Sequence, residues 1–435
     1  MSDFFIEIIR YLLAPSILLA VIAGFCLHYG QKYERLLAAV LAGGGLFFSL
    51  GIYTAKRLQP KKLLKTLTRL NRQLLAAAFI LLLLAIIVFV IFILFARRAR
   101  AEGDEKKAFS KVLGSLFIIL SSLAFGAILA SSLPFVLLKT KEFVAFGEDS
   151  FGTSSLFRVG GYLSGALVLF MLGLSLFQLY RRLSKAPFNL FALLILLALD
   201  FDYALKGISA LARLHILKSS NDLVFRVMIL DDKSLGLNAF IYLAVISMTA
   251  LYVYFTHRHL KGEFATPARR RKARWWLRNC RRWSVSAVVF ILISYLAVTV
   301  LLAYVSRPVV LTPPQEYQET KDLIIIPLED VDDGHLHRFS YEFEGHDIRF
   351  IIVKKPQGSA YGVGLDACDI CGVAGYYERN DDVICKRCDV VMNKATIGFK
   401  GGCNPVPFNY DLKDGQIIIE KTVLEAEKNR FPIGR

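Results

Sequence analysis

Long apolar stretches alternate with short polar ones over the first 305 residues. A helix needs about 20 apolar residues to cross a bilayer. Eight runs reach that length, over roughly 11–29, 36–55, 74–96, 112–138, 159–180, 189–212, 237–256 and 283–305. The pattern predicts an α-helical membrane domain with about eight transmembrane helices over residues 1–305. The first run lacks the basic start of a signal peptide, so we expect it to be retained as a helix.

The pattern changes after residue 305. Pro313 and Pro314 are incompatible with a helix that continues past them. Short alternating or β-branched runs follow, separated by turn residues such as Gly, Pro and Asp. These predicted strands cover 323–328, 335–343, 348–354, 361–365 and 416–422. Residues 306–435 are therefore expected to form a small, mostly β domain that a bound metal would help to stabilise.

The charge is divided unevenly between these two parts. The net charge is +17, yet residues 306–435 hold 16 Lys and Arg against 21 Asp and Glu, so the basic excess lies in the membrane part. Basic residues near helix ends determine orientation, and they do not by themselves indicate nucleic-acid binding. The densest basic stretch, 256–282, is expected in the cytoplasm, and no nucleic-acid partner is expected. The eighth helix would then carry residues 306–435 to the extracytoplasmic side.

One loop disagrees with this orientation. With eight spans the N-terminus also lies outside, and so does the basic stretch 56–73. Either this stretch is an amphipathic helix facing outward, or the count is wrong in the first three helices.

Five cysteines in the second domain carry the candidate chemistry. Cys368 and Cys371 form one C-x-x-C pair, Cys385 and Cys388 form a second, and Cys403 follows. Thiolates at this spacing bind zinc or an iron–sulphur cluster. Disulphides are a third interpretation, disfavoured by the odd number and the short loops. The spacing favours zinc over a cluster, and Cys403 is either a ligand or a neighbouring thiol.

Other residues near the cysteines suggest a supporting role. Gly372 relieves the tight turn of the first pair. Lys386 and Arg387, inside the second pair, would lower the thiol pKa and offset the charge of a thiolate site.

An ordered set of motifs resembles one known family. They are Asp333-Gly-His-Leu-His-Arg-Phe339, Ile348-Arg-Phe350, Leu365-Asp-Ala-Cys-Asp-Ile-Cys-Gly372, Gly375-Tyr376, Ile384-Cys-Lys-Arg-Cys388 and Thr396-Ile-Gly-Phe-Lys-Gly-Gly-Cys-Asn-Pro405. Together they resemble the FtrD-like family of bacterial membrane proteins, described as containing iron and sulphur. The resemblance covers about 90 residues, roughly 333–422.

The resemblance implies more than the spacing does. It shifts the expected cofactor from zinc to an iron–sulphur cluster held by the five cysteines, in a protein of the bacterial inner membrane. It implies a role in iron uptake as an electron-transfer component, with an iron permease and a periplasmic iron-binding or cupredoxin-like protein as partners. His337 matches a motif position, which favours packing near the cysteines or a metal contact; a plain core or surface role is the alternative.

Ionisable residues within the sixth apolar run form a second candidate site. Asp202 and Lys206 share a helix face at i,i+4, whereas Asp200 points elsewhere. Such groups are costly at membrane depth and are often functional, so a proton or cation path is one interpretation. A buried pair that holds helices together is the other. The sequence has no phosphate-binding loop, dinucleotide fingerprint or Ser/His/Asp arrangement, which favours a redox or electron-transfer protein over a classical enzyme.

Overall fold

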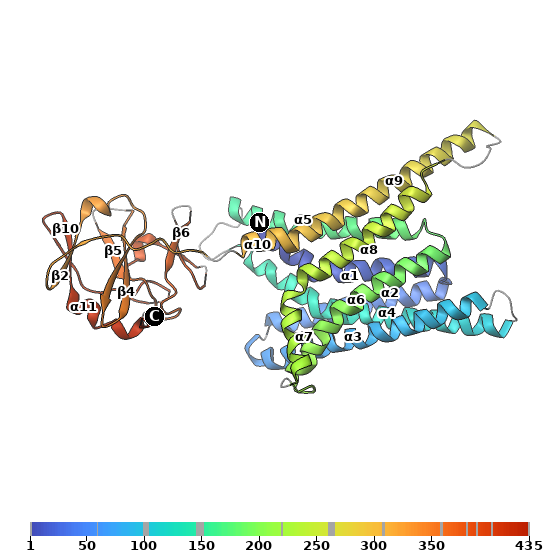
Figure 1. Ribbon diagram of the computed structural model, residues 1–435, viewed down its shortest axis with the longest axis horizontal. Coiled ribbons are helices and arrows are strands. Elements are labelled where there is room, and N and C mark those ends of the chain that lie inside the picture. Colours follow the sequence, from blue (N-terminus) through green and yellow to red (C-terminus); the bar gives the residue numbers. More distant parts are fainter. Residues whose placement is uncertain are drawn as a thin grey trace. The chain divides into compact units, whose positions relative to one another are not determined.

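The computed structural model describes residues 2–58, 60–98, 104–144, 152–218, 221–259, 266–306, 309–356, 360–379, 382–388, 390–401 and 403–433. The chain forms two compact units, Met1–Ser306 and Arg307–Arg435. The first is helical and the second is built mainly of strands (Figure 1).

The first unit is a bundle of long helices. Its elements are α1 (Ser2–His28), α2 (Lys32–Leu58), α3 (Pro60–Arg98), α4 (Asp104–Leu138), η1 (Lys139–Glu142), α5 (Thr153–Tyr180), α6 (Lys185–Arg213), α7 (Asp222–Lys233), α8 (Leu235–Thr256), α9 (Pro267–Leu296), the π-helical turn η2 (Ala297–Leu301) and α10 (Leu302–Val305). Eight helical segments in the described residues are long and apolar enough to cross a membrane. The prediction of about eight transmembrane helices is confirmed, and the protein is a multi-pass membrane protein.

The basic stretch 56–73 belongs to the ends of two of these helices. It covers the last turn of α2 and the first turns of α3. Since α3 has 39 residues, it is about 58 Å long at 1.5 Å per residue, well beyond the ~30 Å of a hydrocarbon core. The basic residues therefore extend a transmembrane helix instead of forming a separate amphipathic one.

The centre of the bundle is helix α1, against which α4, α5 and α6 pack. Ile9, Ile17, Leu18 and Val21 are fully buried there. This helix carries only two acidic residues and one arginine over its 27 positions, which suits a helix surrounded by protein.

Small residues allow α2 and α4 to approach closely. A Cβ atom added to Gly45 would lie 2.6 Å from the Cα of Gly126, whereas one added to Gly43 would meet nothing within 4 Å. Contacts between small residues are a common way for transmembrane helices to associate.

We therefore predict opposite effects from two neighbouring substitutions. Gly45→Ala forces α2 and α4 apart and costs about 1–3 kcal/mol of stability. Gly43→Ala is neutral or stabilising, by up to about 1 kcal/mol, because alanine favours helix. Thermal unfolding of the two variants in one detergent compares them directly, and equal melting temperatures would contradict the close contact.

The second unit contains three antiparallel sheets. The first has the order β1 (Gln318–Glu319), β2 (Leu323–Pro327), β10 (Gln416–Glu420) and β9 (Asp411–Lys413). The second is β3 (His337–Phe343), β4 (His346–Lys354) and β5 (Tyr361–Leu365), and the third is β6 (Tyr376–Arg379), β7 (Asp382–Cys385) and β8 (Val391–Met392). Short helical turns complete it: η3 (Leu328–Asp330), η4 (Lys394–Thr396), α11 (Lys421–Glu425) and η5 (Lys428–Arg430). The predicted fold class, a helical membrane domain followed by a small β-rich domain with clustered cysteines, is confirmed.

Two-residue turns fix the register of the hairpins. Glu344 and Gly345 both have positive φ between β3 and β4, and so do Asp414 and Gly415 between β9 and β10. Two consecutive positive φ values define the type I′ turn that suits twisted antiparallel strands. Both turns lie at turn signals visible in the sequence.

Strand β4 separates two layers of core. Phe350 and Ile352 point into a core shared with the β1-β2-β10-β9 sheet. Ile351 and Val353 point the other way, into a core that also contains Cys368, Cys371 and Cys385. Alternate side chains of one strand therefore support the β sandwich on one face and the cysteine-bearing segment on the other.

Candidate metal centre

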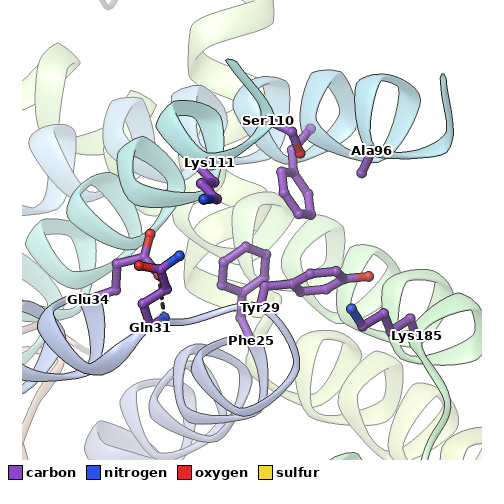
Figure 2. Close-up of a pocket in the computed structure, with 10 residues that line it drawn as sticks. Phe25, Tyr29, Gln31, Glu34, Ala96, Ser110, Lys111 and Lys185 are labelled. Carbon is purple, nitrogen blue, oxygen red and sulfur yellow. Dashed lines mark hydrogen bonds between the residues drawn. The ribbon is translucent and has the colours of Figure 1, made fainter. Parts of the chain in front are cut away.

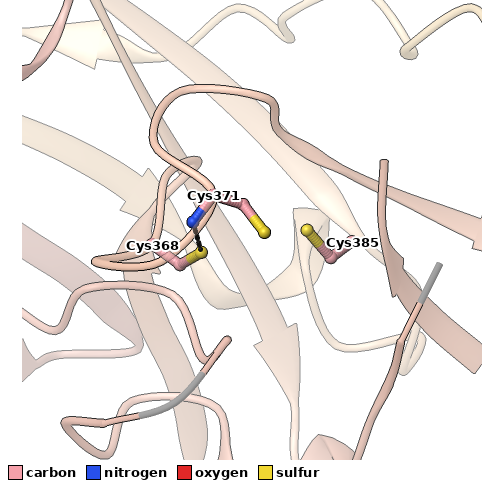
Figure 3. A group of neighbouring side chains, drawn as sticks. All are labelled: Cys368, Cys371 and Cys385. Atoms are coloured by element: carbon pink, nitrogen blue, oxygen red, sulfur yellow. Dashed lines mark hydrogen bonds between the residues drawn. The ribbon is translucent and has the colours of Figure 1, made fainter. Parts of the chain in front are cut away.

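Three segments of chain bring the five cysteines together. Cys368 and Cys371 lie in the turn after β5, and Cys385 ends β7 with Cys388 in the following turn. Cys403 comes from the loop before β9. The sulphur atoms form two groups, each within 4.8 Å: Cys368 with Cys371 and Cys385, and Cys371 with Cys388 and Cys403. Figure 3 shows the first group, with the thiols of Cys371 and Cys385 pointing toward each other.

The first C-x-x-C pair adopts a tight knuckle. The Cys368 N–H donates to the Gly372 carbonyl at 3.1 Å, and the Gly372 N–H donates back to the Cys368 carbonyl at 2.9 Å. The Cys371 N–H donates to the Cys368 Sγ at 3.0 Å. Gly372 has φ of +66°, a conformation that glycine adopts without strain. These hydrogen bonds and the turn at Gly372 fix the backbone of the first pair.

The second pair is attached to the same region through its backbone. The Lys386 N–H donates to the Gly375 carbonyl at 2.9 Å, and the Arg387 Nη1 donates to the Cys371 carbonyl at 3.2 Å. The Arg387 side chain therefore connects the two knuckles, while Lys386 is exposed. Their proposed effect on thiol acidity stays a prediction.

The distances between sulphurs fit metal ligation better than disulphides. All seven cysteines are free, and the Sγ atoms of Cys388 and Cys403 lie 3.7 Å apart. A disulphide requires about 2.05 Å. Two thiolates on one tetrahedral ion, each with a metal–sulphur bond of about 2.3 Å, lie roughly 3.8 Å apart.

The electrostatics of the cluster also favour a cation. Burial raises the pKa of Cys371 and Cys385 above the ordinary value and raises that of Cys403 to about 11. Burial acts in the same direction on Cys388, but the Val390 N–H and the neighbouring thiols hold its pKa below the ordinary value. Five thiols this close cannot all lose their protons unless a positive charge lies among them.

A buried ion pair connects the first cysteine pair to strands β3 and β6. Asp366, two residues before Cys368, is fully buried and accepts from Arg338 Nε at 2.9 Å and from the Tyr376 N–H at 2.8 Å. Arg338 also donates to the Tyr376 carbonyl and, at 2.6 Å, to that of Thr312. The Tyr376 hydroxyl donates to the Cys403 carbonyl at 2.6 Å. One guanidinium and one carboxylate thus connect β3, the first knuckle and β6, and the Tyr376 hydroxyl joins the Cys403 loop to them.

Sequence reasoning gave no role to Arg338, Asp366 or Tyr376. The available signal was Arg338 in a predicted strand that contains both polar and apolar residues, and Asp366 between Leu365 and Ala367, two residues before a C-x-x-C pair. Buried charges are rarely found without partners, so each of these two predicted a partner.

His337 lies outside both groups of sulphur atoms. Its Nδ1 is 2.9 Å from Gln315 Oε1 and its Nε2 is 2.7 Å from Asp333 Oδ1. Both ring nitrogens therefore contact side-chain oxygens, and the residue packs beside Arg338 on β3. Its role near the cysteine site stays a prediction.

Comparison with known families agrees with this geometry. Residues 331–431 match the family described as membrane iron-sulfur containing protein FtrD-like. The C-terminal unit contains an FtrD-like domain. The resemblance seen in the sequence motifs is confirmed, and the FtrD-like match includes all five cysteines. Neither a curated protein nor a solved structure matches the sequence.

The polar residues of the sixth transmembrane helix occupy a separate position. Asp202 is buried and accepts hydrogen bonds from Lys206 Nζ at 2.9 Å, Asn238 Nδ2 at 2.6 Å and Tyr242 Oη at 2.9 Å. These groups line a cavity of about 380 Å³. Asp200 is half-buried, and its Oδ1 has no hydrogen-bond partner within the described residues. Asp202 thus links α6 to α8, and the proton or cation path stays a prediction.

A second membrane cavity, of about 300 Å³, contains a buried acid that the sequence did not single out (Figure 2). Glu34 accepts from the Gln31 N–H at 2.6 Å and from Ser115 Oγ at 2.7 Å. It therefore caps the first turn of α2 and connects it to α4. These hydrogen bonds satisfy the buried carboxylate and give it a structural role.

The buried pair yields a prediction for the FtrD-like domain. Arg338→Gln leaves Asp366 buried without its cationic partner and should cost about 3–5 kcal/mol. Thiol reactivity of the cysteines across a denaturant titration of the full protein reports the loss. Arg430→Gln is the matched control, since Arg430 pairs with Asp369 at 2.9 Å on the surface. Losing that pair should lower the free energy of unfolding by about 1 kcal/mol or less. Equal shifts of the denaturant midpoint in the two variants would show that the buried pair is not essential.

Proposed function

We propose that this protein is the electron-transfer component of a bacterial iron-uptake system, with a cysteine-ligated iron–sulphur centre in its FtrD-like domain. The supporting observation is the convergence of five thiols from three segments in a domain whose family is described as iron-sulphur containing. Thiolates are the usual protein ligands of such clusters. An iron–sulphur centre supplies one-electron redox chemistry when bound.

The residues around the thiols suit that role. The apolar side chains of Ile351, Val353, Met392 and Ile397 bury Cys368, Cys371 and Cys385 and exclude water from them. Cys388 is exposed and Cys403 is half-buried, so the second group forms the accessible edge. Electrons would pass to or from a partner at that edge. From the family resemblance, we propose a periplasmic iron-binding or cupredoxin-like protein as this partner, and an iron permease as the transporter that it serves.

A structural zinc site is a second candidate for the same cysteines. The separation of 3.7 Å between Cys388 and Cys403 matches two ligands on one tetrahedral ion. The same domain would then be a zinc-stabilised scaffold that docks iron carriers onto a permease. Cys371, however, belongs to both sulphur groups, and five thiols exceed the four ligands of one structural zinc site. This surplus favours a centre with more than one metal ion.

Metal analysis of the full protein, purified without oxygen, separates the two candidates. We expect iron, acid-labile sulphide and visible absorption, all lost in Cys385→Ser, because that residue lies in the buried group. Cys280→Ser changes a free cysteine of the membrane unit and should retain them. One zinc per chain without visible absorption would reject the electron-transfer function in favour of the scaffold.

The proposed function also requires the FtrD-like domain to lie outside the cytoplasm. By the positive-inside rule, the basic stretch 256–282 supports a cytoplasmic position for its end of the bundle, from which the last span would lead outward. We expect a fusion of alkaline phosphatase after Arg435 to be active and a fusion in the 256–282 loop to be inactive. The reverse pattern would place the domain in the cytosol and remove the periplasmic partner from the proposal.

A further inference from the structure

The first half of α9 is the most basic helical surface of the described membrane unit. The helix begins at Pro267, with the Thr266 hydroxyl accepting from the Arg269 N–H at 3.3 Å. Its apolar part begins only near Trp283, about 24 Å further along at 1.5 Å per residue. Figure 1 shows this end of α9 extending beyond the helices beside it. Because this extension continues a transmembrane helix, we expect it to pass through the level of the lipid headgroups.

Two cavities flank α9 where it leaves the bundle. One, of about 290 Å³, lies between the end of α8 and α9 and is lined by Arg258, Arg274, Leu277, Arg278 and Arg281. The other, of about 310 Å³, lies between the end of α5 and α9 and is lined by Gln178, Arg181, Arg182, Trp275, Trp276, Asn279 and Trp283.

The four arginines of the first cavity lack an anionic partner among the residues that the structure describes. No carboxylate forms an ion pair with Arg258, Arg274, Arg278 or Arg281 in the described part of the chain. The Nε of Arg281 is buried without a hydrogen-bond partner there, as is the Nε of Arg182 beside the second cavity. Like charges brought together repel one another unless an anion lies between them. Guanidinium groups bind phosphate through paired, charge-assisted hydrogen bonds.

The tryptophans indicate what kind of phosphate would bind. The protein has three tryptophans, and all three line the second cavity. Trp276 also stands edge-on to the His257 ring, with centroids 4.7 Å apart, which links it to the end of α8. Tryptophan is enriched at the headgroup level of membranes, where its ring meets both lipid and water. A phosphate bound beside these rings is therefore expected to belong to a lipid.

We propose that the ends of α5, α8 and α9 form a binding site for an anionic phospholipid. The arginines of the first cavity hold its phosphate, and the tryptophans of the second contact its glycerol and upper acyl chains. Basic cavities between transmembrane helices are known to take such headgroups. The bound lipid would neutralise the repulsion among the arginines and hold the long α9 against α8 and α5. The site is independent of the FtrD-like domain and of the proposed electron transfer.

The tryptophans allow a direct test, because their fluorescence comes entirely from this site. The full protein is reconstituted in phosphatidylcholine vesicles that contain a small fraction of brominated phosphatidylglycerol, and bromine quenches nearby tryptophan. The reference is the same fraction of brominated phosphatidylcholine. We expect stronger quenching by the anionic lipid. Changing Arg258, Arg274, Arg278 and Arg281 to Gln should lower this preference at least about fivefold, the factor expected for even one basic residue at a membrane surface.

A matched variant distinguishes a specific lipid site from the general attraction of anionic lipids by surface charge. Changing Arg269, Arg270, Arg271 and Lys272 to Gln removes four charges from the same helix at positions that line neither cavity. This control should keep most of the preference. Equal quenching by the two brominated lipids, or an equal loss in both variants, would overturn the proposal.

Two further measurements distinguish a lipid site from a site for free anions and from a folding defect. Inorganic phosphate at matched ionic strength should leave the lipid preference intact; if it abolishes the preference, the site binds free anions. If the four-arginine variant does not fold, Arg274→Gln with Arg278→Gln replaces it, since both side chains are exposed. A preference unchanged in that double variant would also overturn the proposal.

Discussion

The FtrD-like domain depends on one buried ion pair. Arg338 and Asp366 are almost completely withdrawn from water, and a buried charge is tolerated only when it is paired and hydrogen-bonded. Each partner meets that condition by contacting backbone as well as the other charge. Asp366 accepts from the Tyr376 N–H, and Arg338 donates to two carbonyls. The pair therefore determines the path of the backbone on either side of Cys368, and the positions of the sulphur atoms follow from that path.

This arrangement explains how short strands support a metal centre. Strands of two to four residues make up β6, β7 and β8, too little sheet to be stable alone. Tyr376, Val383 and Met392 of these strands pack in one core with Ile351 and Val353 of β4 and with Cys368, Cys371 and Cys385. A cation among the thiols would complete the core of this third sheet, so ligation and folding are coupled there.

The membrane helices, the hairpin turns and the cysteine cluster could be predicted from the sequence, for physical reasons. Apolar runs long enough to cross a bilayer have few alternatives, and the two-residue turns at Gly345 and Gly415 need glycine for their backbone conformation. The cysteine spacing brings ligands together whatever the surrounding strands do. The strands β6 to β8 were missed because two to four residues carry no readable period. The pairing of Arg338 with Asp366 was also missed, because partners 28 positions apart leave no local pattern. The same limit applies to Glu34 and Ser115, which meet only when α2 packs against α4.

Charged groups are accommodated in two different ways in this protein. In the FtrD-like domain the buried charges balance within the protein, since Asp366 faces Arg338 and also lies 3.7 Å from Arg349 Nε. Asp202 and Lys206 balance in the same way inside the membrane bundle. At the α9 end no described carboxylate balances the arginines, although their side chains gather around one cavity. Repulsion alone would separate flexible side chains of this length, and water can screen it only where the groups are exposed. The buried Nε of Arg281 has no hydrogen-bond partner among the described residues, and the lipid phosphate proposed here would offset the charge at that position.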